Sequence, residues 1–299
     1  MPNPVIGDVG LWVAQFDFLQ AEQVREVVKK IEQFGYKSIW IPEVMGRESF
    51  TSAALLLQAT SSLIVATGIT NIWGRDPLTM SAAHKTLSEA YPGRFILGLG
   101  VSHAPLVEGL RGHSYQKPLS AMRSYLEAMD AAPCLAPPPS TPPVRMLGAL
   151  GPKMLALAAE KTAGAHPYLV TPAYTQLARD TLGKAPLLVP EQKVLLETDP
   201  TSARRIARAG IAPYLGLPNY ARNLLRLGFS EDDLAGNGSD RLVDALVAWG
   251  TPDTIAKRTQ EHIDAGADSV CLQVLSAGGS GINAVPLSEW ELLAGILPV

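Results

Sequence analysis

The chain has 299 residues, of which 47% are hydrophobic and 18% charged, and its formal net charge is −3. This balance argues against a nucleic-acid-binding protein, which usually carries a basic face, and against a polybasic membrane-surface protein. The apolar content excludes a mainly disordered chain, and the length allows a large core without disulfides or metals.

Strand-like runs alternate with amphipathic helical stretches along the whole chain. The predicted strands are residues 5–13, 36–41, 63–69, 94–99, 144–148, 165–170, a run ending at 193–197, and 269–275. The predicted helices are residues 21–34, 49–60, 76–90, 119–131, 152–162, 174–182, 252–265 and 286–297. Asp76-Pro77 and Thr251-Pro252 pair a capping side chain with a proline at the first helical position, and Gly35 is a typical helix end.

Two segments interrupt this alternation. Residues 133–143 are rich in proline and predict an extended loop, and residues 201–250 form a long helical region with a break near 236–239. The helical region carries no readable motif, although Tyr214, Asn219 and Tyr220 either face a pocket or serve an interface.

Eight strand–helix units in about 250–300 residues predict an α/β protein, a single (β/α)8 TIM barrel over residues 1–299 with a helical insertion after strand seven. An open doubly wound sheet is the alternative. In a barrel, the loops that follow the strands carry the chemistry.

Cys134 and Cys271 form no CxxC pair, which fits a reducing compartment. The N-terminal residues lack a basic segment, and no apolar run reaches about 20 residues. We therefore expect a cytoplasmic protein without a signal peptide or membrane span.

Several familiar site patterns are absent from the sequence. It contains no GxxxxGK[ST], GxSxG or HExxH motif, and its five histidines lack ligand spacing, so no metal site is expected. His166 falls at the start of a predicted strand, which is the wrong end of a barrel. The segment from Gly98 to His103 resembles a dinucleotide fingerprint but lacks the third glycine.

Polar residues and glycines follow strands two to four. Glu43 follows the second strand, either directed to the barrel mouth or capping the next helix. Gly68, beside Ile69 and Thr70, indicates a bulge or the close approach of a ligand, or else a simple corner.

Gly98 and Gly100 after the fourth strand could leave room for a flat ligand. In the same loop, beside Val101 and Ser102, His103 could transfer a proton or simply be solvated.

After strand five, the sequence from Gly148 to Lys153 runs directly into a helix. Proline at position 152 leaves the amides of Leu150 and Gly151, next to Ala149, at the positive helix end. Such a turn can bind a phosphate, although it is also an ordinary βα turn.

These segments, above all Pro92-Gly-Arg-Phe-Ile-Leu-Gly-Leu-Gly100, together resemble the bacterial luciferase-like superfamily and its branch dependent on coenzyme F420. The resemblance implies a deazaflavin ring in the strand-end loops and a non-prolyl cis peptide, which by position is Gly68–Ile69. It implies cofactor-binding roles for Glu43, Gly68, Ile69, Thr70, Gly100, Val101, Ser102, Ala149, Leu150 and Gly151.

The resemblance is incomplete. The position after Glu43, where relatives often carry a catalytic histidine, is Val44, and the catalytic acid of the strand-four loop aligns with His103. A lysine that follows strand six in some relatives is replaced by Thr171-Pro172-Ala173, so sugar phosphates are not an obvious substrate.

Three hypotheses follow. The first is an F420-dependent oxidoreductase that acts on a small organic substrate, with His103 and Glu43 as catalytic residues and a homodimer through the early helices. The second is an FMN-dependent monooxygenase that uses oxygen. The third is a non-catalytic flavin-binding barrel.

Overall fold

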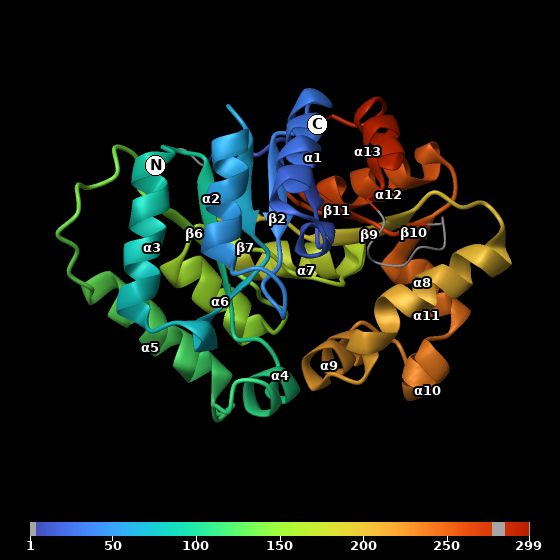
Figure 1. Ribbon diagram of the computed structural model, residues 1–299. Helices are drawn as coiled ribbons and strands as arrows, with labels where there is room; N and C mark the ends of the chain where they lie inside the picture. Colours follow the sequence, from blue (N-terminus) through green and yellow to red (C-terminus); the bar gives the residue numbers. More distant parts are fainter. Residues whose placement is uncertain (1–3, 277–284, 299) are drawn as a thin grey trace.

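The computed structural model describes residues 4–276 and 285–298. Strands and helices alternate through most of this range (Figure 1). The strands are β1 (Val9–Trp12), β2 (Ser38–Ile41), β3 (Ile64–Thr67), β4 (Thr70–Asn71), β5 (Phe95–Gly100), β6 (Val144–Leu147), β7 (Gly164–Ala165), β8 (Leu187–Leu188), β9 (Glu191–Leu195), β10 (Val247–Trp249) and β11 (Val270–Val274).

Helices of four to sixteen residues connect these strands. They are α1 (Ala21–Gln33), α2 (Ser49–Ala59), α3 (Pro77–Ala90), α4 (Ala104–Gly109), α5 (Pro118–Ala131), α6 (Pro152–Lys161), α7 (Pro172–Leu182), α8 (Pro200–Leu215), α9 (Pro218–Arg226), α10 (Glu231–Leu234), α11 (Asp240–Leu246), α12 (Pro252–Asp264) and α13 (Leu287–Ala294). Among the described residues, no helix is long and apolar enough to cross a membrane.

The described strands form one parallel sheet in the order β10-β9-β11-β1-β2-β3-β5-β6-β7-β8, and the short β4 also pairs with β5. Only Val189 and Pro190 separate β8, which pairs with β7, from β9, which pairs with β11. Because β11 in turn pairs with β1, the sheet curls round on itself in a barrel-like α/β fold. The carboxyl ends of parallel strands lie together, so the loops that follow them share one end of the molecule.

Apolar side chains form separate layers on the two faces of the curled sheet. Trp40, Ala66 and Ile96 belong to an inner cluster, whereas their neighbours Ile39 and Val65 pack in the outer cluster that lies under the helices. This alternation is what a strand with both faces buried requires. It explains why the predicted strands read as nearly continuous apolar runs.

The predicted helix boundaries are confirmed where the sequence supplies a cap. Asp76 accepts a hydrogen bond from the Thr79 N–H at 2.9 Å, and α3 begins at Pro77. Gly35, just after α1, has a φ of +102°, which favours glycine.

Other boundaries differ from the prediction. The strand expected at residues 165–170 ends at Ala165, because Pro167 has no N–H for the ladder and Leu169 has a φ of +57°. Within residues 201–250 the helices break at three places rather than one, and 247–249 form β10. The six-residue α4 was missed because it is too short to show helical periodicity.

Candidate functional site

A bulge joins β3 to β4 at the carboxyl end of the sheet. The Gly68–Ile69 peptide bond within it is cis, which confirms the position that the resemblance implied. The Trp12 Nε1–H, at the end of β1, donates to the Gly68 carbonyl at 3.0 Å, and the Gly68 N–H donates to the Ile41 carbonyl at 2.7 Å. Neighbouring strands β1 and β2 therefore fix the bulge.

The glycines of β5 make room for this bulge. A Cβ at Gly98 would lie 1.9 Å from the carbonyl oxygen of Thr67, and one at Gly100 would lie 2.4 Å from the Ile69 side chain. Both distances are far below van der Waals contact. The space expected to admit a flat ligand beside these glycines is thus filled by the adjoining strand and its bulge.

Glu43, in the loop after β2, is held on several sides. Its carboxylate accepts hydrogen bonds from the Arg75 guanidinium and, at 2.9 Å, from the Asn71 N–H. The Ser49 hydroxyl donates to it at 3.2 Å. That hydroxyl also lies 2.9 Å from the hydroxyl of Thr70 in β4, so Glu43 joins the loop after β2 to β4.

The environment of Glu43 keeps it ionised. Burial raises the pKa of Glu43, but the hydrogen bonds from Arg75 and Asn71 and the positive charge of Arg75 outweigh this, so the net pKa is lowered. A lowered pKa in the folded state adds stability above the ordinary glutamate pKa of 4.5, and that stability is lost as the pH falls through the lowered value. Glu43 is therefore a fixed anion at neutral pH, not a proton donor.

We expect Arg75→Gln to raise the pKa of Glu43, because burial still disfavours the charge while its main partner is gone. Carboxyl-carbon NMR titration of glutamate-labelled protein measures this directly. Arg123→Gln, which removes an exposed partner of Glu160, is the matched control. An unchanged Glu43 titration in Arg75→Gln would show that Arg75 does not stabilise the carboxylate.

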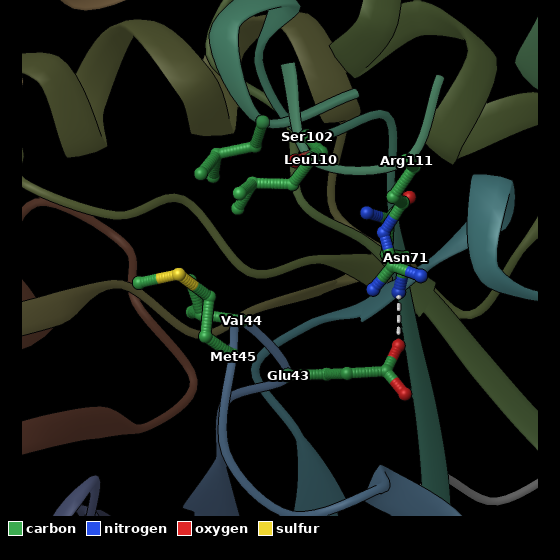
Figure 2. A pocket seen from close by; sticks show the side chains of 8 residues that line it. Glu43, Val44, Met45, Asn71, Ser102, Leu110 and Arg111 are labelled. Carbon is green, nitrogen blue, oxygen red and sulfur yellow. Dashed lines mark hydrogen bonds between the residues drawn. The ribbon is translucent and has the colours of Figure 1, made fainter. Parts of the chain in front are cut away.

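A cavity of about 250 Å³ opens beside Glu43 (Figure 2). The loops after β2 and β5 and the segment around α4 enclose it, so it lies at the carboxyl end of the sheet. It is lined by Glu43, Val44, Met45, Asn71, Ser102, Leu106, Leu110 and Arg111. Sequence reasoning missed Arg111, because nothing in its neighbourhood marks a lone arginine as facing a cavity.

His103 lies one residue beyond the cavity-lining Ser102 and occupies the N-cap position of α4, without a capping hydrogen bond from its side chain. Its imidazole is half-buried and packs against the ring of Tyr220 in α9, with centroids 5.5 Å apart. Burial lowers the pKa of His103 below 6.5, and a hydrogen bond with Asn219 partly offsets this. The imidazole is therefore mainly neutral at pH 7. Helices α4 and α9, distant in sequence, meet at one end of the molecule (Figure 1).

The turn after β6 leads into the ten-residue helix α6. Gly151 is its N-cap, and a Cβ added there would meet nothing within 4 Å in the part of the chain that the structure describes, so the turn borders open space there. The Tyr174 hydroxyl lies 3.0 Å from the carbonyl oxygens of both Ala149 and Leu150 and fixes their orientation. An open helix N-terminus of this kind favours an anion.

The sequence predicted His166 at the amino end of its strand. In the structure it instead directly follows the short β7. Its buried ring stacks on Trp40 with centroids 4.2 Å apart, and Nδ1 lies 2.7 Å from the Val189 carbonyl. Burial lowers its pKa to about 4, so the ring is neutral. Its Nε2 lies close to Gly68, because a Cβ added to that glycine would be 2.9 Å from this nitrogen.

Sequence reasoning also missed a buried ion pair in β9. Lys193 Nζ lies 3.0 Å from Glu191 Oε1, and the two side chains are 1% and 0% exposed. Lys193 Nζ also donates to the Tyr168 hydroxyl at 2.7 Å. Two opposite charges two residues apart, between the apolar residues 187–189 and 194–196, were the signal that could have indicated it.

Comparison with known proteins gives a consistent result. The model of the luciferase-like monooxygenase family matches residues 11–269. A protein of Mycobacterium tuberculosis named as a coenzyme F420-dependent oxidoreductase is 26% identical, over 91% of this chain and 94% of that one.

Two solved structures share the fold. A coenzyme F420-dependent tetrahydromethanopterin reductase from Methanopyrus kandleri superposes with a TM-score of 0.78 at 17% identity, covering 97% of this chain and 98% of that one. A type II Baeyer–Villiger monooxygenase from Pseudomonas putida, in complex with FMN, gives 0.72 at 15% identity and covers 98% of both chains.

Proposed function

Because the chain belongs to the luciferase-like monooxygenase family, we propose that it is an oxidoreductase that transfers a hydride between coenzyme F420 and a small organic substrate. The relative from Mycobacterium tuberculosis supports this cofactor, and it aligns with 91% of the chain. The observation that carries the proposal is the position of His103: a half-buried, mainly neutral imidazole in the loop after β5, directly after Ser102, which lines the strand-end cavity.

The residues at the strand ends fit a planar ring with an anionic tail. Gly68, Ile69 and Thr70 would support the ring from the bulge, and the main chain of Val101 and Ser102 would lie along it, whereas Gly100 serves to admit the Ile69 side chain. Ala149, Leu150 and Gly151 would hold the phosphate at the N-terminus of α6, where the open side-chain position of Gly151 leaves room.

The protein contributes position and proton transfer to this chemistry. A bound deazaflavin would act as the acceptor or donor of the hydride, which carries two electrons. His103 in its neutral form takes the proton from the substrate oxygen in the oxidative direction and returns it in the reductive direction. Glu43, fixed by Arg75, orients the groups at the ring edge by its negative charge rather than by donating a proton.

The same proposal covers the domain organisation of the chain and its pairing with a second copy. Residues 1–299 form one (β/α)8 barrel domain, the helices of residues 201–250 are an insertion after the seventh strand, and the chain pairs with a second copy through its early helices. The parallel, curled sheet supports the barrel, and the contact of His103 with Tyr220 supports a role of the insertion at the site.

Titration of the purified chain with oxidised F420 and with FMN, followed by fluorescence, tests the cofactor. We expect F420 to bind at least about tenfold more tightly, a difference of about 1.4 kcal/mol.

Tighter binding of FMN, with oxygen-dependent turnover, would instead establish a monooxygenase, which the FMN-containing structural neighbour keeps as the second candidate. Binding of F420 without turnover on a panel of alcohols, aldehydes and enones would identify a non-catalytic barrel.

A further inference from the structure

A second polar cluster lies at the carboxyl end of the sheet, apart from the cavity beside Glu43. It is centred on Lys193, whose ammonium group has three acceptors: Glu191 Oε1 at 3.0 Å, the Tyr168 hydroxyl at 2.7 Å and Gln273 Oε1 at 2.8 Å. An ammonium group has three donors, so each of them has a partner.

A buried ion pair of this kind is weak evidence for stability, because the desolvation of both charges offsets their attraction. Leu169 donates its N–H to the second oxygen of Glu191 at 3.0 Å, so the pair is also tied to the segment after β7. The pair is electrically neutral overall, and its charged atoms are covered. The ammonium group of Lys193 polarises the hydroxyl of Tyr168, to which it donates.

A second phenol continues this chain of hydrogen bonds. The hydroxyl of Tyr168 lies 2.9 Å from that of Tyr214 in α8, and both side chains are only partly buried. Burial raises the pKa of both phenols, so both remain protonated at neutral pH.

The phenols adjoin the groups already assigned to the site. Trp12, which holds the bulge, lies with its ring 5.3 Å from that of Tyr168. The ring of Tyr220 contacts both Tyr214, at 5.3 Å, and His103, at 5.5 Å.

The protons of this chain of hydrogen bonds can be arranged in two ways. If Tyr168 donates to Gln273 Oε1, which lies at 2.8 Å, Tyr214 donates to Tyr168, and within the described residues no other donor occupies the lone pairs of Tyr214. If Tyr168 donates to Tyr214, the Tyr214 proton has no acceptor within these same residues and can be donated to a ligand. Only hydroxyl rotations separate the two states, and Lys193 stabilises both by donating to Tyr168.

We propose that the Tyr214 hydroxyl, backed by Tyr168 and Lys193, binds the oxygen atom of a neutral alcohol or carbonyl substrate. In the donating state the Tyr214 hydroxyl donates to a carbonyl oxygen, and it donates equally to an alcohol oxygen whose own proton passes to His103, so one subsite serves both members of a redox pair. Because every donor of Lys193 is engaged and Glu191 balances its charge, the subsite does not favour an anionic substrate. This assignment rests on the proposed function for its place in a reaction, but binding tests it separately.

The experiment measures binding of cyclohexanol, cyclohexanone and cyclohexanecarboxylate to the full chain by saturation-transfer NMR, with and without oxidised F420. We expect both neutral probes to bind and the carboxylate to bind at least tenfold more weakly. Tyr214→Phe keeps the ring and is expected to weaken both neutral probes about tenfold, as loss of one hydrogen bond does.

Tyr36→Phe is the matched control, because its hydroxyl donates to the Trp290 carbonyl at 2.9 Å near the amino end of β2. It is expected to bind all three probes as the wild type does. The assignment is overturned if Tyr214→Phe binds both neutral probes within twofold of wild type, if the carboxylate binds best, or if neither neutral probe binds the wild type. The measurement without F420 tests the Tyr214 subsite by itself. Failure of F420 to bind would therefore count against the proposed function and not against this subsite.

Discussion

Replacement of His103 by Gln is expected to reduce turnover by about 10²–10⁴-fold while F420 affinity stays within about twofold of wild type. Glutamine keeps a polar side chain of similar reach but cannot exchange a proton near neutral pH. Steady-state kinetics and the cofactor titration on the same preparation separate the two effects. Because burial lowers the pKa of His103, the oxidative rate of the wild type should fall only below pH 6.5, where the imidazole gains its proton.

His113→Gln provides the control for this substitution, since His113 is exposed and lies ten residues further along the same region. It should leave both turnover and the acid limb of the pH profile unchanged. If His103→Gln turns over at the wild-type rate, or retains the same acid limb, His103 has no part in proton transfer and another group must be sought among the cavity residues.

Lys193→Met is expected to lower the free energy of unfolding by about 3–5 kcal/mol, because it leaves the fully buried Glu191 carboxylate without its counter-charge. Methionine fills a similar volume, so the loss reports the unpaired charge rather than a cavity. Urea unfolding at pH 7, followed by circular dichroism, measures the change.

The double variant Glu191→Gln with Lys193→Met separates charge from packing. Glutamine retains an acceptor for the Leu169 N–H, and no unpaired charge remains. We expect it to recover most of the stability lost in the single variant, to within about 1–2 kcal/mol of wild type, as neutral replacements of buried pairs often do. Equal instability of the single and double variants would mean that Lys193 acts through its packing and not through its charge.

The sequence alone determined the alternation of elements, because helix caps and apolar periodicity are local. The Asp76 cap, the helix end at Gly35 and the apolar runs of the inner strands follow from neighbouring residues and are present in the structure. The Gly68–Ile69 bond followed from resemblance over a short segment, and the structure has it there. Short elements such as α4 and β7 left too little pattern to be recognised or bounded.

Only the tertiary structure decided which side chains meet at the strand ends. Arg75 contacts Glu43 although 32 positions separate them, and Tyr220 contacts His103 from α9. Lys193 in β9 contacts Tyr168, which follows β7, and Gln273 in β11. Each of these contacts depends on curling the sheet until distant loops share one end, so no local pattern encodes it. The burial that shifts the pKa values of His103 and Glu43 has the same origin, because it requires groups from several elements to exclude water together.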